Sequence, residues 1–294
     1  MENLESKILN SEIRMKNPEQ RFDTDYIFIS DLHAPIHSKK SVKILTSVMN
    51  DIKPNNVIFG GDEVDAYYLS KYDTSVKHKS FQEEIDIFVN EIFAPLYEVN
   101  PKANYMFVAS NHSTARLKKF MDESPAFHGM RMLTYQNMIE ESMKTYMKHQ
   151  PKIEVVQEVV VKYKKDPIYI FKHGNKVTKA SAKAELGLEG ISGMSGHKHT
   201  ANTHLYNNRQ GVIQWDTVGH LSDVSAQGYM KALSNGHPDW TQGFGYVQQF
   251  GNLMIPQNVI IYKKNKSTKE CVVNGKVYTN KDKIYVPKTR KVLR

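Results

Sequence analysis

The sequence contains a single cysteine, Cys271, among its 294 residues. A lone cysteine cannot form an intrachain disulfide, and it also excludes the multi-thiolate clusters that hold structural zinc. The scarcity fits a protein of a reducing compartment. Any metal site must therefore be built from His, Asp, Glu or Asn side chains.

Long hydrophobic runs are absent as well. No apolar stretch approaches the roughly 20 residues that a membrane-spanning helix requires. The polar start, Met1-Glu2-Asn3, lacks the apolar core of a secretory signal. We expect a cytoplasmic protein that has no membrane partner.

Net charge is missing from most of the chain and is concentrated at its end. Residues 253–294 hold 11 Lys or Arg against two acidic residues, whereas residues 1–252 are formally neutral. Such a segment attracts polyanions, although a solvated charged surface is an equally ordinary explanation. Asn274-Gly275, between two short β-type runs, predicts a two-residue hairpin, so we expect residues 253–294 to form a basic β-rich appendage.

Short apolar runs recur along the chain, and each ends in a polar cluster. The runs are 26–29, 57–59, 105–108, 168–171 and 191–194, and their length is typical of buried strands. Helical spacing of apolar residues between Phe81 and Leu96, with shorter helices expected over 40–51 and 176–187, favours an α/β layered domain.

This organisation predicts three regions. Residues 1–22 form a polar N-terminal extension, residues 23–252 form the main domain, and residues 253–294 form the basic appendage. Within that domain, residues 117–150 have a helical composition and are rich in methionine. They would form a cap over the site or an oligomer surface, or their methionines would simply fill gaps in the core.

The polar clusters that follow the five runs contain the residues of a metal site. They are Asp31-Leu32-His33, Gly60-Gly61-Asp62, Asn111-His112, His173 and His197-Lys198-His199. Each is uninformative alone, but five in order after predicted strands are not expected by chance. Imidazoles, carboxylates and an amide oxygen suit two divalent cations held side by side, with manganese favoured and iron or zinc also compatible.

This ordered series resembles the signature of the calcineurin-like metallophosphoesterase superfamily. The resemblance covers roughly residues 24–220 and implies a four-layer α-β-β-α sandwich. It also implies that Asp31, His33, Asp62 and His199 bind the first metal, and that Asp62 bridges to a second metal. Asn111, His173 and His197 would complete the second site, and His112 would stand over the substrate phosphate as the catalytic residue.

The chain is also similar to a branch of that superfamily found in tailed bacteriophages and bacteria. The shared features are Asp-Leu-His-x-Pro, ending here at Pro35, and the late Trp240-x-x-Gly-Phe244. A viral protein of this kind would act in the cytoplasm of its host. The sequence departs from the superfamily at Ser110, where glycine is usual, and at Asp216–His220, where many members have Asn-Pro-Gly-Ser.

The chemistry expected of such a site is hydrolysis of a phosphate ester. Two cations would neutralise the phosphate and lower the pKa of a water between them, so that a hydroxide attacks phosphorus in line. His112 would stabilise or protonate the departing oxygen. We expect Asp65 to orient a loop or a histidine, while His37 and Arg116 are candidates for contact with the substrate or for a structural role.

The substrate is less well determined than the reaction. The basic C-terminal segment, which carries three tyrosines, favours a phosphodiesterase acting on DNA or RNA. A small-nucleotide phosphodiesterase or a phosphomonoesterase is the main alternative. A non-catalytic scaffold with this fold is a third hypothesis. The oligomeric state is not determined by the sequence.

Overall fold

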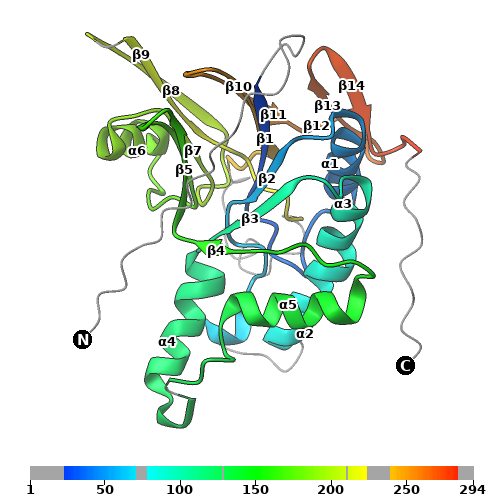
Figure 1. Cartoon of the computed structure of the whole chain (residues 1–294). Coiled ribbons are helices and arrows are strands. Elements are labelled where there is room, and N and C mark those ends of the chain that lie inside the picture. The colour runs from blue at the N-terminus through cyan, green and yellow to red at the C-terminus, as the bar shows by residue number, and fades with distance from the viewer. Residues whose placement is uncertain (1–22, 71–77, 128, 210, 224–238, 284–294) are drawn as a thin grey trace.

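Two β-sheets packed face to face form the centre of the protein. The computed structural model describes residues 23–70, 78–127, 129–209, 211–223 and 239–283, so the predicted extension over residues 1–22 lies outside the described residues (Figure 1). The six strands of the first sheet lie in the order β11 (Leu253–Ile260), β10 (Gly243–Phe250), β1 (Thr24–Ile29), β2 (Asn56–Phe59), β3 (Asn104–Val108) and β4 (Val155–Val156). The five strands of the second lie in the order β5 (Glu158–Tyr163), β6 (Asp166–Lys172), β7 (Gly193–Ser195), β9 (Gly211–Thr217) and β8 (Asn202–Asn208).

The strands that lead to the polar clusters are parallel within each sheet. In the first sheet β1 pairs with β2 and β2 pairs with β3 in parallel, and in the second β6 pairs with β7 in parallel. Parallel neighbours end at the same edge of a sheet, so the residues after them are brought close together.

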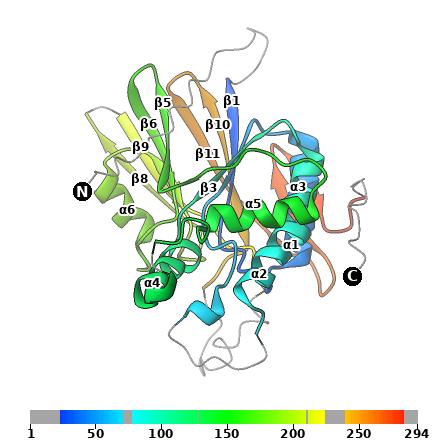
Figure 2. The ribbon, with the colours of Figure 1, turned by 60° about the horizontal axis from the view of Figure 1, so that its bottom comes forward.

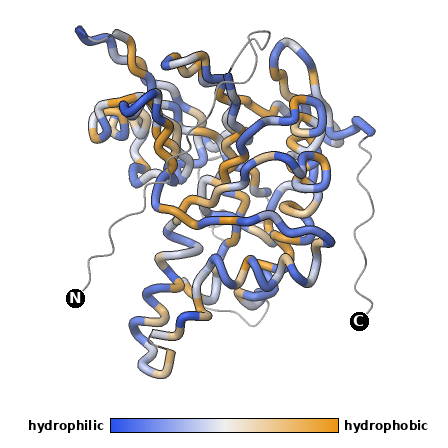
Figure 3. The backbone as a smooth tube through the Cα atoms, in the orientation of Figure 1, coloured by the Kyte–Doolittle hydropathy of each residue, from blue (hydrophilic) through white to orange (hydrophobic). Residues whose placement is uncertain are grey.

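Both faces of the first sheet are buried, which explains the continuous apolar runs. Tyr26 and Phe28 of β1 point to the second sheet, where their rings lie 5.3 and 5.7 Å from the ring of Phe171. Ile27 and Ile29 point the other way, into the core beneath the helices. Figure 3 shows hydrophobic stretches running along these central strands.

Helices cover the outer face of each sheet, giving the predicted four-layer α-β-β-α sandwich (Figure 2). The first sheet is covered by α1 (Lys39–Ile52), α2 (Phe81–Phe88), the π-helical segment η2 (Val89–Phe93), α3 (Ala94–Val99) and α5 (Tyr135–Tyr146). On the second sheet, α6 (Ser181–Glu189) packs through Ala182 and Leu186 against Trp215. This helix was predicted over residues 176–187 but begins at Ser181. The backbone N–H groups of residues 175 and 176 donate to the Glu185 carboxylate, which holds the preceding residues in a loop.

The methionine-rich segment over residues 117–150 divides into two parts. The 12-residue helix α5 is part of the main core, where it buries Tyr135, Ile139 and Met143. In contrast, α4 (Arg116–Glu123) and the short η4 (Pro125–Phe127) project from the body, as Figure 1 shows. Met132, between η4 and α5, is 68% exposed, so these methionines do not all serve the core.

The C-terminal part contributes to two sheets. Strand β11 pairs along its whole length with β10, so the boundary drawn after residue 252 falls inside a hairpin of the main sheet. The three strands of a separate small sheet are β12 (Tyr262–Lys263), β13 (Lys269–Val273) and β14 (Lys276–Thr279). The predicted hairpin is confirmed, with positive φ angles of 50° at Asn274 and 77° at Gly275.

In the small sheet, β14 lies against α1. Lys276 Nζ and the Tyr278 hydroxyl both bond Asp51 of that helix, at 2.8 and 2.5 Å. None of the helices in the described part of the chain combines the length and the hydrophobicity that a membrane span requires.

Candidate metal centre

The five predicted polar clusters converge at one edge of the sandwich. Asp31 follows β1, Asp62 follows β2 and Asn111 follows β3, while His173 and His197 follow β6 and β7 of the second sheet. Three overlapping groups of side chains offer ligand atoms within 4.8 Å of one another: Asp31, His33 and His199; His33, Asp62 and His112; and Asp62, His173 and His197. The structure thus brings together the residues that the sequence predicted as metal ligands.

The backbone at this edge is strained in a way that points to function. Nine non-glycine residues of the described chain have positive φ angles, and five of them belong to these groups. They are Asp31, His33, Asp62, His197 and His199, with φ between 49° and 67°. Non-glycine residues rarely adopt this conformation, and it persists only where the surrounding structure enforces it. Here it turns successive side chains of each loop toward a common point.

Backbone hydrogen bonds lock the loops after β1 and β2 to each other. The N–H of Asp31 donates to the carbonyl of Gly61 at 3.1 Å, and the N–H of His33 donates to the carbonyl of Asp62 at 2.9 Å. Gly61 has a φ of 94°, and a Cβ there would lie 2.6 Å from His173 Nδ1. A glycine is therefore required for the loop to pass beside the histidine.

Ser110, the residue that departs from the superfamily pattern, has a structural task. Its hydroxyl accepts a hydrogen bond from the N–H of Asp62 at 3.0 Å and from the N–H of Ser113 at 3.3 Å. The second bond caps the π-helical turn η3 (Asn111–Ala115), which carries Asn111 and His112. The serine thus joins the loop of Asp62 to the loop of Asn111.

The first ligand group consists of buried Asp31, His33 and His199. His199 Nε2 lies 3.1 Å from Asp31 Oδ1 and 3.1 Å from His33 Nε2. Two imidazole nitrogens approach this closely only when a proton or a cation lies between their lone pairs.

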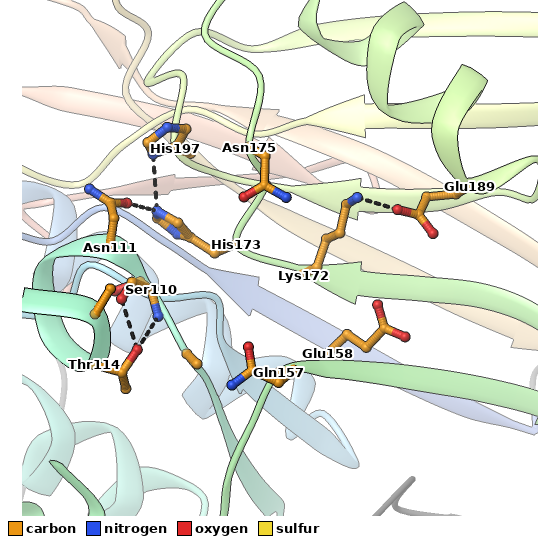
Figure 4. Close-up of a pocket in the computed structure, with 13 residues that line it drawn as sticks. Ser110, Asn111, Thr114, Gln157, Glu158, Lys172, His173, Asn175, Glu189 and His197 are labelled. Carbon is orange, nitrogen blue, oxygen red and sulfur yellow. Dashed lines mark hydrogen bonds and ion pairs between the residues drawn. The ribbon is translucent and has the colours of Figure 1, made fainter. Parts of the chain in front are cut away.

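The second ligand group, formed by Asp62, Asn111, His173 and His197, repeats this arrangement. His173 Nε2 lies 3.1 Å from His197 Nδ1, 2.8 Å from Asn111 Oδ1 and 3.3 Å from Asp62 Oδ2. The other nitrogen of His173, Nδ1, donates to the carbonyl of Gly60 at 2.8 Å, so Nε2 is the nitrogen directed at the group. Figure 4 shows Asn111 and His197 directed toward His173.

Asp62 connects the two groups. Its Oδ2 lies 3.9 Å from His33 Nε2 on one side and 3.3 Å from His173 Nε2 on the other. Burial alone would raise the pKa of Asp62, but the surrounding imidazoles hold it well below its usual range. For His173 the effects are reversed. Burial alone would lower its pKa, but the charge of Asp62 outweighs burial and raises that pKa to about 9. Asp62 is therefore a buried carboxylate that attracts positive charge from both sides.

The donor set fits divalent cations. Asp31 and Asp62 are each at most 1% exposed, and within the described chain all their ion pairs are with histidines. A buried carboxylate is costly unless a positive charge or a metal accompanies it. Imidazole nitrogen, carboxylate and amide oxygen together, with no thiolate, suit manganese, iron or zinc.

A neighbouring set of residues fixes the orientation of two histidines of the centre. Asp65 Oδ1 lies 3.1 Å from His33 Nδ1, which leaves Nε2 of that ring directed at the first group. His112 Nδ1 donates to the Asp65 carbonyl at 2.7 Å, and the Arg116 guanidinium donates to the same carbonyl at 2.7 Å. Burial lowers the pKa of His112 to about 4.

The two candidates for substrate contact, Arg116 and His37, lie in different places. Arg116 lies beside the centre, with Nη2 3.1 Å from His112 Nε2. His37 belongs to none of the three groups; it is buried, and its Nε2 lies 3.3 Å from Glu91 Oε2. It therefore faces the helical layer rather than the ligand groups.

The sequence did not single out His220, which the structure places against the centre. This fully buried ring lies 5.4 Å from the His199 ring, and its Nδ1 lies 2.7 Å from the Ser222 hydroxyl. Trp240, noted only as part of a late motif, contacts His199 with ring centroids 4.3 Å apart. Both come from segments with no predicted strand before them, so no pattern pointed to either contact.

Comparison with known proteins gave structural similarities only. A scan against protein-family models found no match, and a search of curated proteins found no similar sequence. Among solved structures, Vps29 from Chaetomium thermophilum has 11% identity and a TM-score of 0.44, covering 88% of this chain and 99% of that one. A dimetal phosphatase from Danio rerio has 11% identity and a TM-score of 0.41, covering 90% and 98%. Vps29 from Entamoeba histolytica complexed with zinc has 12% identity and a TM-score of 0.38, covering 87% and 96%. Similarity at this level does not identify a function.

Proposed function

We propose that this chain is a binuclear metal-dependent phosphoesterase of the calcineurin-like metallophosphoesterase superfamily. The observation that carries the proposal is the position of Asp62, whose Oδ2 lies between two groups of converging imidazoles. One carboxylate shared by two nitrogen-rich groups is the arrangement that holds two cations as a clamp.

The ligands divide between the two positions. Asp31, His33 and His199 would hold the first cation, with Asp62 shared, and Asn111, His173 and His197 would complete the second. When bound, such cations neutralise phosphate charge and make an associated water acidic near neutral pH. A shell of nitrogen and oxygen donors suits manganese, iron or zinc, and among these we favour manganese.

The protein's own residues supply orientation and proton handling. Asp65 and the Gly60 carbonyl fix the tautomers of His33 and His173, so both present Nε2 to the centre. His112 is anchored through Nδ1 to the Asp65 carbonyl, and its Nε2 lies 3.9 Å from Asp62 Oδ2. We assign it to stabilising or protonating the leaving oxygen of the substrate; protonation requires that Nε2, which faces the Arg116 guanidinium, takes up a proton when the phosphate binds.

Within this class of reaction, we propose that the substrate is a phosphodiester bond of a nucleic acid. Its support is the charge of residues 253–294. Part of that charge is already engaged, because Lys264 pairs with Glu270 and Lys276 pairs with Asp51, both at 2.8 Å. A small-nucleotide diester or a phosphomonoester is the alternative.

Removing the whole segment would delete β11 from the main sheet. A truncation after residue 283 is the better test, because it removes four Lys or Arg residues. Nuclease activity with a shallower dependence on salt in the truncated protein would support binding of a strand. An unchanged salt dependence would remove the support from charge.

The test of the reaction is hydrolysis of bis-p-nitrophenyl phosphate and p-nitrophenyl phosphate with added Mn²⁺. Asp62→Asn is the control. Mn²⁺-dependent hydrolysis that the variant loses would support the enzyme, and the faster of the two substrates would decide between diester and monoester. No hydrolysis of either, together with no bound metal after purification, would favour a non-catalytic scaffold.

A further inference from the structure

A cavity of about 440 Å³ opens directly beside the second ligand group. Asn111, His173 and His197 line one end of it, and these are the residues we assign to the second cation. A phosphate held between the two cations would therefore have this cavity next to it. Figure 4 shows that the ligand side chains lie at one end of the cavity and the charged residues at the other.

The far end of the cavity is acidic. Its charged lining residues, among those described, are Glu158, Glu189 and Lys172. Lys172 Nζ pairs with Glu189 and also lies 2.8 Å from Glu185 Oε2, so its charge is shared between two carboxylates. Lys172 is only 7% exposed, and its stem packs near Trp215, with Nζ 5.1 Å from the ring centroid. The ammonium is thus held in place, and the net charge presented to a ligand is negative.

The middle of the cavity is polar but uncharged. The amides of Gln157 and Asn175 lie between the two ends in Figure 4. Amides offer both donors and acceptors, so they match hydroxyl, amine or heterocyclic groups without requiring charge.

We infer that this cavity receives the organic group that is esterified to the substrate phosphate. It selects a small uncharged or cationic polar group over an anionic one. The inference rests on the proposed function, because the cations would hold the phosphate at the cavity's inner end. An anionic tail would meet two carboxylates and an ammonium that is already neutralised. A nucleic-acid strand, which carries its next phosphate close by, would meet the same repulsion in this cavity. The inference therefore weighs against the nucleic-acid substrate proposed above and favours its alternative, a small phosphate ester.

The test uses three phosphonates of similar size that the enzyme cannot hydrolyse. They are 2-aminoethylphosphonate, propylphosphonate and 3-phosphonopropionate, whose far ends are cationic, neutral and anionic. Binding to the Mn²⁺-loaded full chain is measured by calorimetry. We expect the anionic compound to bind roughly tenfold more weakly than the cationic one.

Charge variants assign the effect to the cavity. Glu158→Gln should reduce the ratio between the cationic and anionic compounds several-fold, and adding Glu189→Gln should reduce it further. Glu123→Gln is the matched control, because this exposed residue of α4 does not line the cavity. The control should leave the ratio unchanged.

The possible outcomes separate this inference from the proposed function. Equal binding of the three phosphonates, or tightest binding of the anionic one, would overturn the inference and leave the phosphoesterase intact. A ratio that Glu158→Gln and the double variant leave unaltered would also overturn it. Failure of all three to bind, with no hydrolysis of p-nitrophenyl phosphate, would contradict both.

Discussion

Replacing Asp65 by alanine should weaken one metal position and spare the other. Asp65 Oδ1 lies 3.1 Å from His33 Nδ1, and His33 belongs to the first ligand group. Burial alone would raise the pKa of Asp65, but its hydrogen bond to His33 and the nearby charges lower it, so the group is a carboxylate that accepts from the ring. Without that acceptor the His33 ring loses its fixed tautomer and orientation.

The size of the effect follows from the role of such partners in metal sites. Losing the carboxylate behind a ligating histidine typically costs about 10–100-fold in metal affinity, or about 1.4–2.7 kcal/mol. The second group should keep its affinity, because His173 is oriented by the Gly60 carbonyl instead. The expected calorimetric titration of Asp65→Ala with Mn²⁺ therefore has one weakened and one unchanged step.

Two variants serve as comparisons for this titration. Asp65→Asn retains an oxygen acceptor and should fall between wild type and Asp65→Ala. Asp122→Ala, which changes an exposed residue of α4, should titrate like wild type. Wild-type affinity at both steps in Asp65→Ala would refute the reasoning, and equal weakening of both steps would show that Asp65 acts on the whole edge.

Three further predictions concern catalysis, packing and pH. His112→Ala should retain bound metal and lose most turnover, whereas His197→Ala should lose the second metal; loss of all metal in His112→Ala, measured by elemental analysis, would contradict the assignment. Gly245→Ala should destabilise the protein by about 1–3 kcal/mol in urea unfolding, because its Cβ would lie 2.1 Å from a methionine sulfur of the opposing sheet, while Gly187→Ala in α6 meets no atom within 4 Å and should not destabilise. Burial raises the pKa of Glu84 to about 8, so the folded state keeps a proton that the unfolded state releases above about pH 4.5. Stability should therefore fall as pH rises between these values, and Glu84→Gln should flatten that dependence by up to about 1.4 kcal/mol per pH unit; an unchanged slope would contradict a protonated Glu84.

The convergence of the polar clusters could be predicted from the sequence, because each cluster depends on local signals. A buried strand needs a continuous apolar run, and a parallel strand ends at a shared edge, so the position of Asp31 or His173 after its run already places it. The hairpin at Asn274-Gly275 was predictable for the same reason, since two residues determine the turn.

Other features depend on partners that are distant in the sequence. β1 pairs antiparallel with β10, which comes near the other end of the chain, and no local pattern identifies that partner. The acidic end of the cavity arises only when α6 places Glu189 beside Lys172 of β6. The contact of His220 with His199 likewise requires the folded loop, and the histidine itself carries no distinguishing spacing.

The most direct test of the central claim is the rate of p-nitrophenyl ester hydrolysis as a function of Mn²⁺ equivalents bound to metal-free protein. Two cations acting as one clamp predict little activity at the first equivalent, a rise with the second and saturation at two. Saturation at one equivalent, or hydrolysis that is independent of bound metal, would contradict a binuclear centre joined by Asp62.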